Sequence, residues 1–249
     1  MTIPKIIHYC WFGRNPLPVS AQKCIASWRK YLPDYEIKEW NEDNFDVNSI
    51  PYTKQAYEAK KYAFVSDYAR FWILYHYGGL YFDTDVELIN QDIKKVISRG
   101  PFMGQEKGAF MDGKQMVNPG LGLGVQANHS FYEQMLRVYH SLEFWGNNGI
   151  EKTTTIVTYT TKELYANGMK PSCDIQEVCG IWIYPVDYFC PMDSTTGIIT
   201  LTDKTVSVHH YDCSWVNHDS LRYKLHQLKN LVYKVLGQRV AEVINKKIH

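Results

Sequence analysis

The chain has 249 residues, of which 45% are hydrophobic and 21% charged, and its formal net charge is +1. This composition is that of a globular protein with one folded unit, and the near-zero charge gives no reason to expect a nucleic-acid partner. No stretch approaches the roughly 18 consecutive apolar residues of a membrane span, and the N-terminus lacks a signal peptide's basic region and long apolar core. We therefore expect a cytoplasmic protein.

The first segments of the chain predict the opening of an α/β sheet. Residues 3–9 form a short apolar run rich in β-branched side chains, as in a buried strand, and residues 20–31 have helical spacing. Residues 35–40 alternate in the manner of a strand. Strand, helix and strand in this order predict a β-α-β unit.

The middle of the chain predicts a long helix followed by a third strand. Apolar side chains fall mostly on one helical face over 53–77, Gly78 and Gly79 end the helix, and residues 80–82 re-enter the sheet. Further along, the pattern predicts a helix over 130–141 and strands at 100–104, 121–126, 181–185 and 206–210.

Two aspartates follow the third predicted strand. Asp83 and Asp85 are separated by one residue, so on an extended chain both side chains point the same way. Two like charges this close repel each other unless a cation lies beside them, and a hard divalent ion with oxygen ligands is the usual partner. The carboxyl edge of an α/β sheet is also where ligands bind. The pair therefore predicts a metal and ligand site.

The Asp-x-Asp triplet is weak evidence when taken alone. The chain has fourteen aspartates, and chance alone then gives about 0.8 such triplets. Upstream, Asp67 and Arg70 lie three residues apart on one helical face, where they could form a structural ion pair or bind the hydroxyl groups of a sugar or ribose. Gly78-Gly79 permits the turn that brings this pair beside the two aspartates.

These motifs together are more specific than any one of them. The chain reads Ser-Asp-x-x-Arg at 66–70 and, eight positions after the arginine, Gly-Gly-x-Tyr-x-Asp-x-Asp at 78–85. Its opening, IPKIIHYCWFG at 3–13, is followed by Ser27-Trp28 and Pro33-Asp34-Tyr35. This combination resembles the glycosyltransferases with a sugar-binding DXD region, which include bacterial capsular polysaccharide enzymes and yeast mannosyltransferases and, more distantly, the clostridial glucosylating toxins. The match covers roughly the first 90 residues.

The resemblance implies a fold, a donor and a set of site residues. It implies a GT-A type glycosyltransferase fold with a Rossmann-like mixed sheet flanked by helices, a nucleotide diphosphate sugar as donor, and Mn²⁺ or Mg²⁺ as cofactor. The implied roles by position are base stacking for Trp11, donor-sugar binding for Asp67 and Arg70, ribose and sugar contact for Asp83, metal binding for Asp85, and donor contact for Tyr81.

Two later segments add candidates. The stretch 206–215 resembles the late His-x-x-x-Ser-Trp segment of these enzymes, which implies one histidine as a metal ligand and Ser214 and Trp215 as contacts to the diphosphate. Neighbouring strand residues face opposite sides, so only one histidine can point into the site, and we choose His210 with His209 as the alternative. Asn118, before Pro119-Gly120, predicts either a segment close to the donor or a glycine-rich turn.

The reaction that we expect is the transfer of a hexose or N-acetylhexosamine to a glycan acceptor, with retention of configuration and in bacterial surface polysaccharide assembly. A UDP-sugar is the favoured donor. The alternatives are a mannosyltransferase using GDP-mannose, an enzyme that glycosylates protein, and a metal-dependent phosphohydrolase. A phosphatase with an aspartyl nucleophile expects Asp-x-Asp-x-Thr, whereas this chain has Glu87 at the last position.

The C-terminal segment 220–249 differs from the catalytic domain that we expect at 1–219. It contains seven lysines and arginines and one acidic residue, Glu242. Its leucines and valines recur at steps of three and four, which predicts an amphipathic helix. This helix could pack on the catalytic domain by its apolar face, or bind an anionic membrane surface that carries a lipid-linked acceptor, at the inner face of the cytoplasmic membrane.

The membrane hypothesis predicts that the full-length protein sediments with anionic liposomes at low salt and is released by high salt, because each basic residue near the headgroups adds about 1 kcal/mol. A protein truncated after Asp219 should stay in solution. Equal behaviour of the two proteins would leave the segment as a structural helix.

Overall fold

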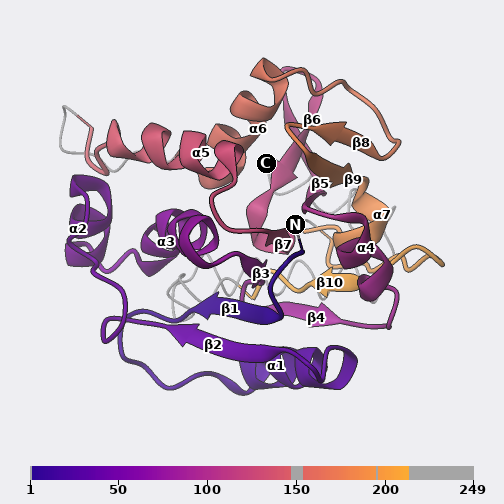
Figure 1. The fold of residues 1–249 in the computed structure, drawn as a ribbon, viewed down its shortest axis with the longest axis horizontal. Coiled ribbons are helices and arrows are strands. Elements are labelled where there is room, and N and C mark those ends of the chain that lie inside the picture. The colour runs from indigo at the N-terminus through magenta and orange to yellow at the C-terminus, as the bar shows by residue number, and fades with distance from the viewer. Residues whose placement is uncertain (1, 147–153, 195, 213–249) are drawn as a thin grey trace, which may run out of the picture.

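A computed structural model describes residues 2–146, 154–194 and 196–212 (Figure 1). The segment 220–249, with its predicted helix, therefore lies outside the described residues. Within them the helices are α1 (Val19–Tyr31), α2 (Pro51–Glu58), α3 (Tyr62–Tyr77), α4 (Ile93–Arg99), α5 (Ser130–His140), α6 (Ile156–Ala166) and α7 (Val186–Phe189). The strands are β1 (Ile6–Cys10), β2 (Glu36–Trp40), β3 (Gly79–Tyr81), β4 (Val86–Leu88), β5 (Phe102–Met111), β6 (Lys114–Asn118), β7 (Leu123–Val125), β8 (Gln176–Val178), β9 (Ile181–Tyr184) and β10 (Ser207–His209).

Among the described residues, eight strands form a mixed sheet in the order β2-β1-β3-β7-β5-β9-β8, with β6 paired to β5. β1 runs parallel to β2 and β3, whereas β7 runs antiparallel to β3. The predicted β-α-β opening is confirmed by β1, α1 and β2. A second, two-stranded sheet pairs β4 with β10, and this small sheet forms one wall of the site described below.

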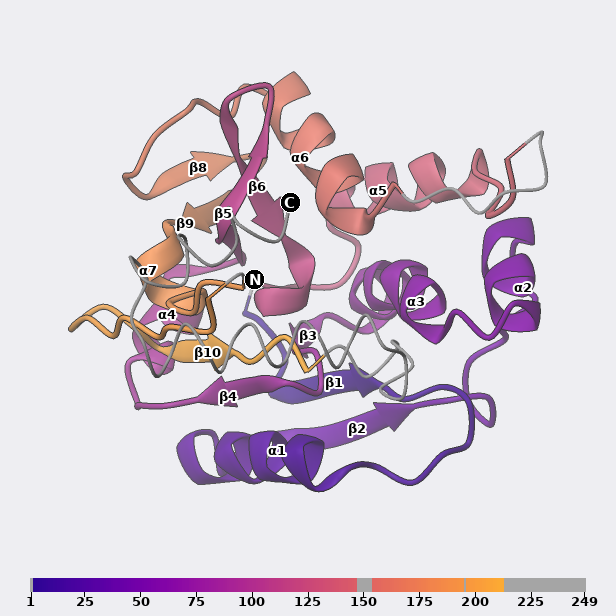
Figure 2. The ribbon, with the colours of Figure 1, turned by 180° about the vertical axis from the view of Figure 1, so that it is seen from behind.

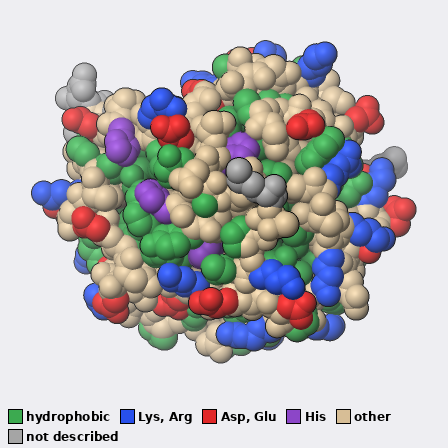
Figure 3. Space-filling view, in the orientation of Figure 1, with side chains coloured by type: hydrophobic (Ala, Val, Ile, Leu, Met, Phe, Trp, Pro, Cys, Tyr) green, Lys and Arg blue, Asp and Glu red, His purple; other side chains and the backbone are tan. Residues whose placement is uncertain are grey.

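Helices cover both faces of the main sheet. One hydrophobic core lies between the sheet and α2, α3, α5 and α6, and a second lies between the sheet and α1, α4 and α7. Figure 1 and the view from behind in Figure 2 show α1 and α3 on opposite sides of β1. On the face shown in Figure 3, lysine and arginine side chains are interspersed with acidic ones. None of the helices within the described residues is long and apolar enough to cross a bilayer.

The helix predicted over 53–77 is two helices. α2 ends at Glu58 and α3 begins at Tyr62, and between them Lys60 adopts a left-handed conformation with φ of +59°. The apolar pattern runs through the break because α2 and α3 bury their apolar faces in the same core. Periodicity reports which face is buried and not where the backbone turns.

The remaining predicted elements are present with shifted ends, and six elements were not predicted. Those predicted at 100–104, 121–126, 130–141, 181–185 and 206–210 correspond to β5, β7, α5, β9 and β10. The elements that were missed are β4, α4, β6, α6, β8 and α7. Most of these are short, and short segments carry too few residues to show a period.

The side chain of His8 on β1 forms hydrogen bonds to β2 and to the residue before β3. Its side chain is fully buried, its Nε2 lies 3.0 Å from the carbonyl oxygen of Gly78, and its Nδ1 accepts from the indole N–H of Trp40 at 3.0 Å. Because Nδ1 accepts, the ring is neutral and Nε2 donates. Gly79 packs against this ring at a φ of +102°, and a Cβ there would lie 2.7 Å from the carbonyl oxygen of Ile6. Only glycine fits the turn beside His8.

The neutral state of His8 predicts a pH dependence of folding. Burial lowers the pKa of His8 from 6.5 to about 4, so the unfolded chain binds the proton more tightly than the folded chain. The free energy of unfolding should therefore fall as the pH drops from about 6.5 to about 4, with a total contribution of about 3 kcal/mol. Urea unfolding of wild type and His8→Gln across this range should show a shallower slope for the variant.

His76→Gln is the matched control, because His76 is exposed on α3 and should leave the slope unchanged. Identical slopes for wild type and His8→Gln would contradict the assignment.

Candidate active site

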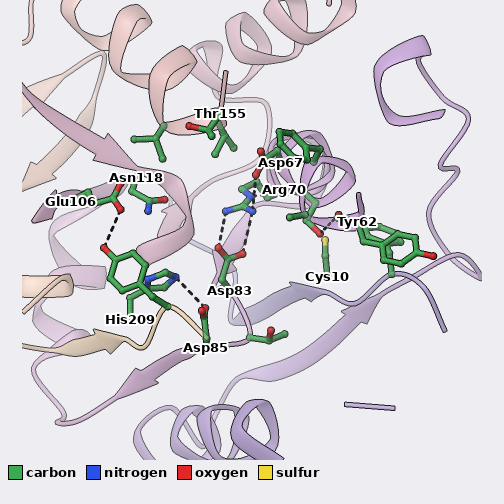
Figure 4. A pocket seen from close by; sticks show the side chains of 18 of the residues that line it. Cys10, Tyr62, Asp67, Arg70, Asp83, Asp85, Glu106, Asn118, Thr155 and His209 are labelled. Atoms are coloured by element: carbon green, nitrogen blue, oxygen red, sulfur yellow. Dashed lines mark hydrogen bonds and ion pairs between the residues drawn. The ribbon is translucent and has the colours of Figure 1, made fainter. Parts of the chain in front are cut away.

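A cavity of about 650 Å³ opens at the carboxyl ends of β1 and β3. It is lined by residues of the β1–α1 loop, α3, the β3–β4 turn, β5, β6, the start of α6 and the segment around β10. Figure 4 shows its labelled side chains. A volume of this size is typical of small-molecule and cofactor sites.

Helix α3 contributes Asp67 and Arg70, which the sequence placed on one helical face. Arg70 Nη2 lies 3.1 Å from Asp67 Oδ1, and both side chains are buried. Arg70 Nε also donates to the carbonyl oxygen of Ser66 at 3.2 Å, which fixes the guanidinium. The pair is therefore the ion pair of the first interpretation, and both residues also line the cavity, while their binding to a sugar stays a prediction.

Arg70 joins α3 to the Asp-x-Asp segment. Its Nη1 and Nη2 each lie 3.2 Å from an oxygen of Asp83, a bidentate contact. The Tyr81 hydroxyl donates to Asp83 at 3.1 Å, and the guanidinium lies over the Tyr81 ring. Tyr81 is 1% exposed and is not among the residues that line the cavity. The structure thus places Tyr81 behind Asp83 and Arg70 and outside the cavity lining, and its predicted donor contact stays a prediction.

Burial sets the electrostatics of these three groups. It raises the pKa of Asp67 to about 7, with Arg70 opposing the shift. Burial also raises the pKa of Asp83, again against Arg70. The guanidinium itself stays protonated, because the neighbouring carboxylates outweigh its own burial and raise its pKa.

The local structure of Asp83-Thr84-Asp85 differs from the prediction. β3 ends at Tyr81, and the triplet forms a turn that is closed by the Val86 N–H donating to the Asp83 carbonyl oxygen at 3.0 Å. The strand alternation invoked for the two aspartates does not apply. Their carboxylates still come together, in a cluster with His209 whose potential ligand atoms lie within 4.8 Å of one another.

His209, and not His210, lies in this cluster. His209 Nε2 is 3.1 Å from Asp85 Oδ1, whereas His210 Nε2 is 2.9 Å from Glu87 Oε2. The preferred ligand His210 is therefore corrected to the alternative, His209. The physical reason is the register of β10 on β4, which pairs His209 with Val86 and turns the next side chain the other way.

Asp85 is held by β10 and the residues that follow it. The backbone N–H of His210 donates to the Asp85 carbonyl oxygen at 2.9 Å, and that of Asp212 to its carboxylate at 3.1 Å. Burial opposes the ionisation of Asp85, but His209 and this N–H outweigh it and lower its pKa. Burial by itself would lower the pKa of His209, but the neighbouring Asp85 carboxylate outweighs burial and raises that pKa.

The segment after β6 is a single turn of 3-10 helix, Pro119–Leu121, that lies beside the cavity, and its closeness to a donor stays a prediction. Asn118 lines the cavity, and its side-chain oxygen accepts from the Gly120 N–H at 2.7 Å. A Cβ on Gly120 would lie 2.3 Å from Asp83 Oδ2. The glycine is thus required by contact with Asp83, a packing reason that the sequence did not indicate.

Trp11 lines another part of the cavity. Its indole N–H donates to the carbonyl oxygen of Asn15 at 2.6 Å, which holds the loop after β1 in place. The ring of Tyr62 covers Gly13, where a Cβ would lie 2.3 Å from a ring carbon. Trp11 is partly buried against the second hydrophobic core, and its predicted stacking on a base stays a prediction. Ser214 and Trp215, the other predicted donor contacts, lie outside the described residues.

Two residues of the site carried no sequence signal. Glu106 on β5 lines the cavity and accepts from the Tyr211 hydroxyl at 3.1 Å. Burial raises the pKa of Glu106, with Tyr211 opposing. Glu106 belongs to no recognisable motif, and Tyr211 stands at an unspecified position of the segment 206–215, so only the closeness of β5 to the end of β10 brings them together.

The cluster of Asp83, Asp85 and His209 fits Mn²⁺ or Mg²⁺. Carboxylate oxygens suit both ions, and an imidazole nitrogen favours Mn²⁺ of the two. These residues could hold the ion on one side and leave its other positions to a ligand's phosphates. Within the cluster, Asp83 also contacts Arg70 and Tyr81, and Asp85 contacts His209 and the Asp212 N–H.

Residues 18–102 match the protein family described as "Glycosyltransferase sugar-binding region containing DXD motif". This range holds Asp67, Arg70, Asp83 and Asp85. The solved structure of PaToxG glycosyltransferase is similar with a TM-score of 0.50 and 18% sequence identity, covering 66% of this chain and 69% of that one. The predicted resemblance to glycosyltransferases with a sugar-binding DXD region is confirmed, and so is the GT-A type fold.

Two curated relatives come from Schizosaccharomyces pombe. Inositol phosphoceramide mannosyltransferase 3 is 37% identical over 91 residues, which are 34% of this chain and 24% of that protein. Inositol phosphoceramide mannosyltransferase 2 is 33% identical over 87 residues, or 33% of this chain and 25% of that protein. The aligned segment thus spans about a quarter of these relatives.

The assignment of His209 predicts a difference between adjacent variants. His209→Gln should lower the affinity for Mn²⁺ on the order of 10- to 100-fold, the range seen even for partners outside the ligand shell. His210→Gln should leave it unchanged, because that ring faces Glu87. Titration calorimetry of Mn²⁺ in the presence of UDP measures both, and a larger loss in His210→Gln would reverse the assignment.

Proposed function

We propose that this chain is a metal-dependent glycosyltransferase that moves a hexose or N-acetylhexosamine from a nucleotide diphosphate sugar to a glycan acceptor. The observation that carries this proposal is the joining of the Asp83–Asp85–His209 cluster to the Asp67–Arg70 pair in one cavity. The first group suits a metal-bound diphosphate, and the second suits sugar hydroxyl groups, since a carboxylate accepts and a guanidinium donates.

Each part of the cavity has a role in this proposal. When bound, the divalent ion offsets the charge on the departing diphosphate. Asp85 and His209 hold that ion, Arg70 orients Asp83, and Asp67 accepts from a hydroxyl of the donor sugar.

A UDP-sugar remains the favoured donor, with Trp11 stacking on the base. GDP-mannose is the second candidate, and the names of the two yeast relatives, which are mannosyltransferases, favour it. Those names also include a phosphoceramide acceptor, in keeping with a lipid-linked acceptor at the inner face of the cytoplasmic membrane. The proposed setting is bacterial surface polysaccharide assembly.

We propose retention of configuration at the anomeric carbon. In this mechanism the acceptor hydroxyl attacks from the face that the diphosphate leaves, and the leaving phosphate takes the proton of that hydroxyl. Product anomers identified by NMR would decide between retention and inversion.

Donor hydrolysis tests the proposed function. Wild type incubated with UDP-glucose, UDP-galactose, UDP-N-acetylglucosamine and GDP-mannose should release the nucleotide diphosphate from at least one of them, and EDTA should stop the release until Mn²⁺ is restored. Asp85→Asn should lower the rate on the order of 10²-fold or more, because a neutral oxygen replaces a charged metal ligand.

Asp187→Asn is a suitable control, since Asp187 lies on α7 and is not among the residues that line the cavity. Release that continues in EDTA, or that proceeds equally in wild type and Asp85→Asn, would contradict the metal-dependent mechanism.

A further inference from the structure

Glu106 stands on a bulge of β5 that points it into the cavity. Along β5 and β6, Gln105 pairs with Val117 and Phe110 with Gln115, so four residues of β5 face one residue of β6. A bulge of this kind re-aims side chains and is common beside active sites. The Gln115 amide holds the bulge by donating to the carbonyl oxygens of Glu106 and Ala109.

The other side of the bulge is also fixed. The backbone N–H of Lys107 lies 3.4 Å from Cys190 Sγ, and Lys107 Nζ donates to the Pro191 carbonyl oxygen at 3.0 Å. Cys190 in turn lies 3.0 Å from the Tyr211 hydroxyl, the group that donates to Glu106. The carboxylate is therefore positioned by its own strand and by the segment after β10.

Glu106 differs from the other acidic side chains of the cavity in its partners. Asp67 and Asp83 are paired with Arg70, and Asp85 with His209. The partners of Glu106 are the Tyr211 hydroxyl and the Asn118 side chain, and it makes no ion pair within the described part of the chain. It is also not a member of the Asp83–Asp85–His209 cluster. Its direct partners are therefore uncharged groups, and the positive charge of His209 acts on it only through space.

Tyr211 links this carboxylate to the cluster. Its ring meets the His209 ring edge-on at 4.2 Å between centroids, and its φ is +52°, which residues other than glycine rarely adopt. Strained backbone of this kind occurs where a side chain must be held in a particular place. In Figure 4, Glu106 lies beside Asn118, on the side of the cavity away from Asp67 and Arg70.

We propose that Glu106 is a catalytic residue whose carboxylate faces the anomeric carbon of the donor and stabilises the positive charge that develops there. This inference rests on the proposed function. The anomeric carbon is bonded both to the diphosphate at the metal cluster and to the sugar ring at Asp67 and Arg70, so it lies in the middle of the cavity. As its bond to the phosphate oxygen breaks, the electron pair leaves with the diphosphate. A carboxylate that is not held in an ion pair can stabilise the charge left on the sugar.

Glu106→Gln tests this role, because the amide keeps the shape and can still accept from Tyr211. The probe is the sugar nucleotide that wild type hydrolyses fastest among UDP-glucose, UDP-galactose, UDP-N-acetylglucosamine and GDP-mannose. The kcat for hydrolysis should fall on the order of 100-fold or more. The KM, the affinity for Mn²⁺ with UDP, and the thermal unfolding temperature should remain close to those of wild type.

Two further variants separate charge from shape. Glu106→Asp keeps the charge and should retain more activity than Glu106→Gln. Glu87→Gln is the matched control. Glu87 is a carboxylate on β4 that pairs with His210 and is not among the residues that line the cavity. This variant should behave as wild type.

Four results would overturn the inference. These are unchanged kcat in Glu106→Gln, a rise in KM that accounts for its whole loss of activity, an equal loss in Glu87→Gln, and an Asp variant no more active than the Gln variant. If wild type hydrolyses none of the four donors, the proposed function fails and this inference fails with it. Active wild type with active Glu106→Gln rejects the inference alone.

Discussion

The site depends on the buried guanidinium of Arg70. It is 3% exposed and contacts Asp67 on its own helix, Asp83 in the turn after β3, and the ring of Tyr81. A buried ion without partners is strongly unfavourable, whereas one that is paired and hydrogen-bonded on several sides is tolerated. Arg70 and the two carboxylates therefore require one another, and together they fix α3 against the end of the third strand.

This constraint accounts for much of the surrounding sequence. Asp83 is held so close to the segment after β6 that position 120 has no room for a side chain. The turn before β3 is restricted in the same way, because Gly79 packs on the buried ring of His8. Both of these glycine positions are thus contact requirements, and each lies opposite a polar group of the site or the sheet.

Asp85 is left for a different partner. Because Arg70 occupies both oxygens of Asp83, the next carboxylate along the turn can face His209, which arrives on β10 from the far end of the described chain. Because Asp83 pairs with Arg70 and Asp85 pairs with His209, the cavity has two chemically distinct ends. Arg70 and Asp67 lie at one end, Asp85 and His209 lie in the turn and strand at the other, and Glu106 lies beside Asn118 on the side away from Asp67 and Arg70.

The sequence by itself determined the opening β-α-β unit, the α/β class, and the motif that joins Asp67, Arg70, Asp83 and Asp85. These features are local, because periodicity and short spacing are written in neighbouring residues. Only the tertiary structure decided that His209 and not His210 meets Asp85, that Tyr81 is buried, and that Glu106 enters the cavity. The first follows from the pairing of β10 with β4, the second from the packing of Arg70 over the Tyr81 ring, and the third from the bulge in β5. Strand register between residues more than a hundred positions apart is set by the packing of the whole chain, and no local pattern records it.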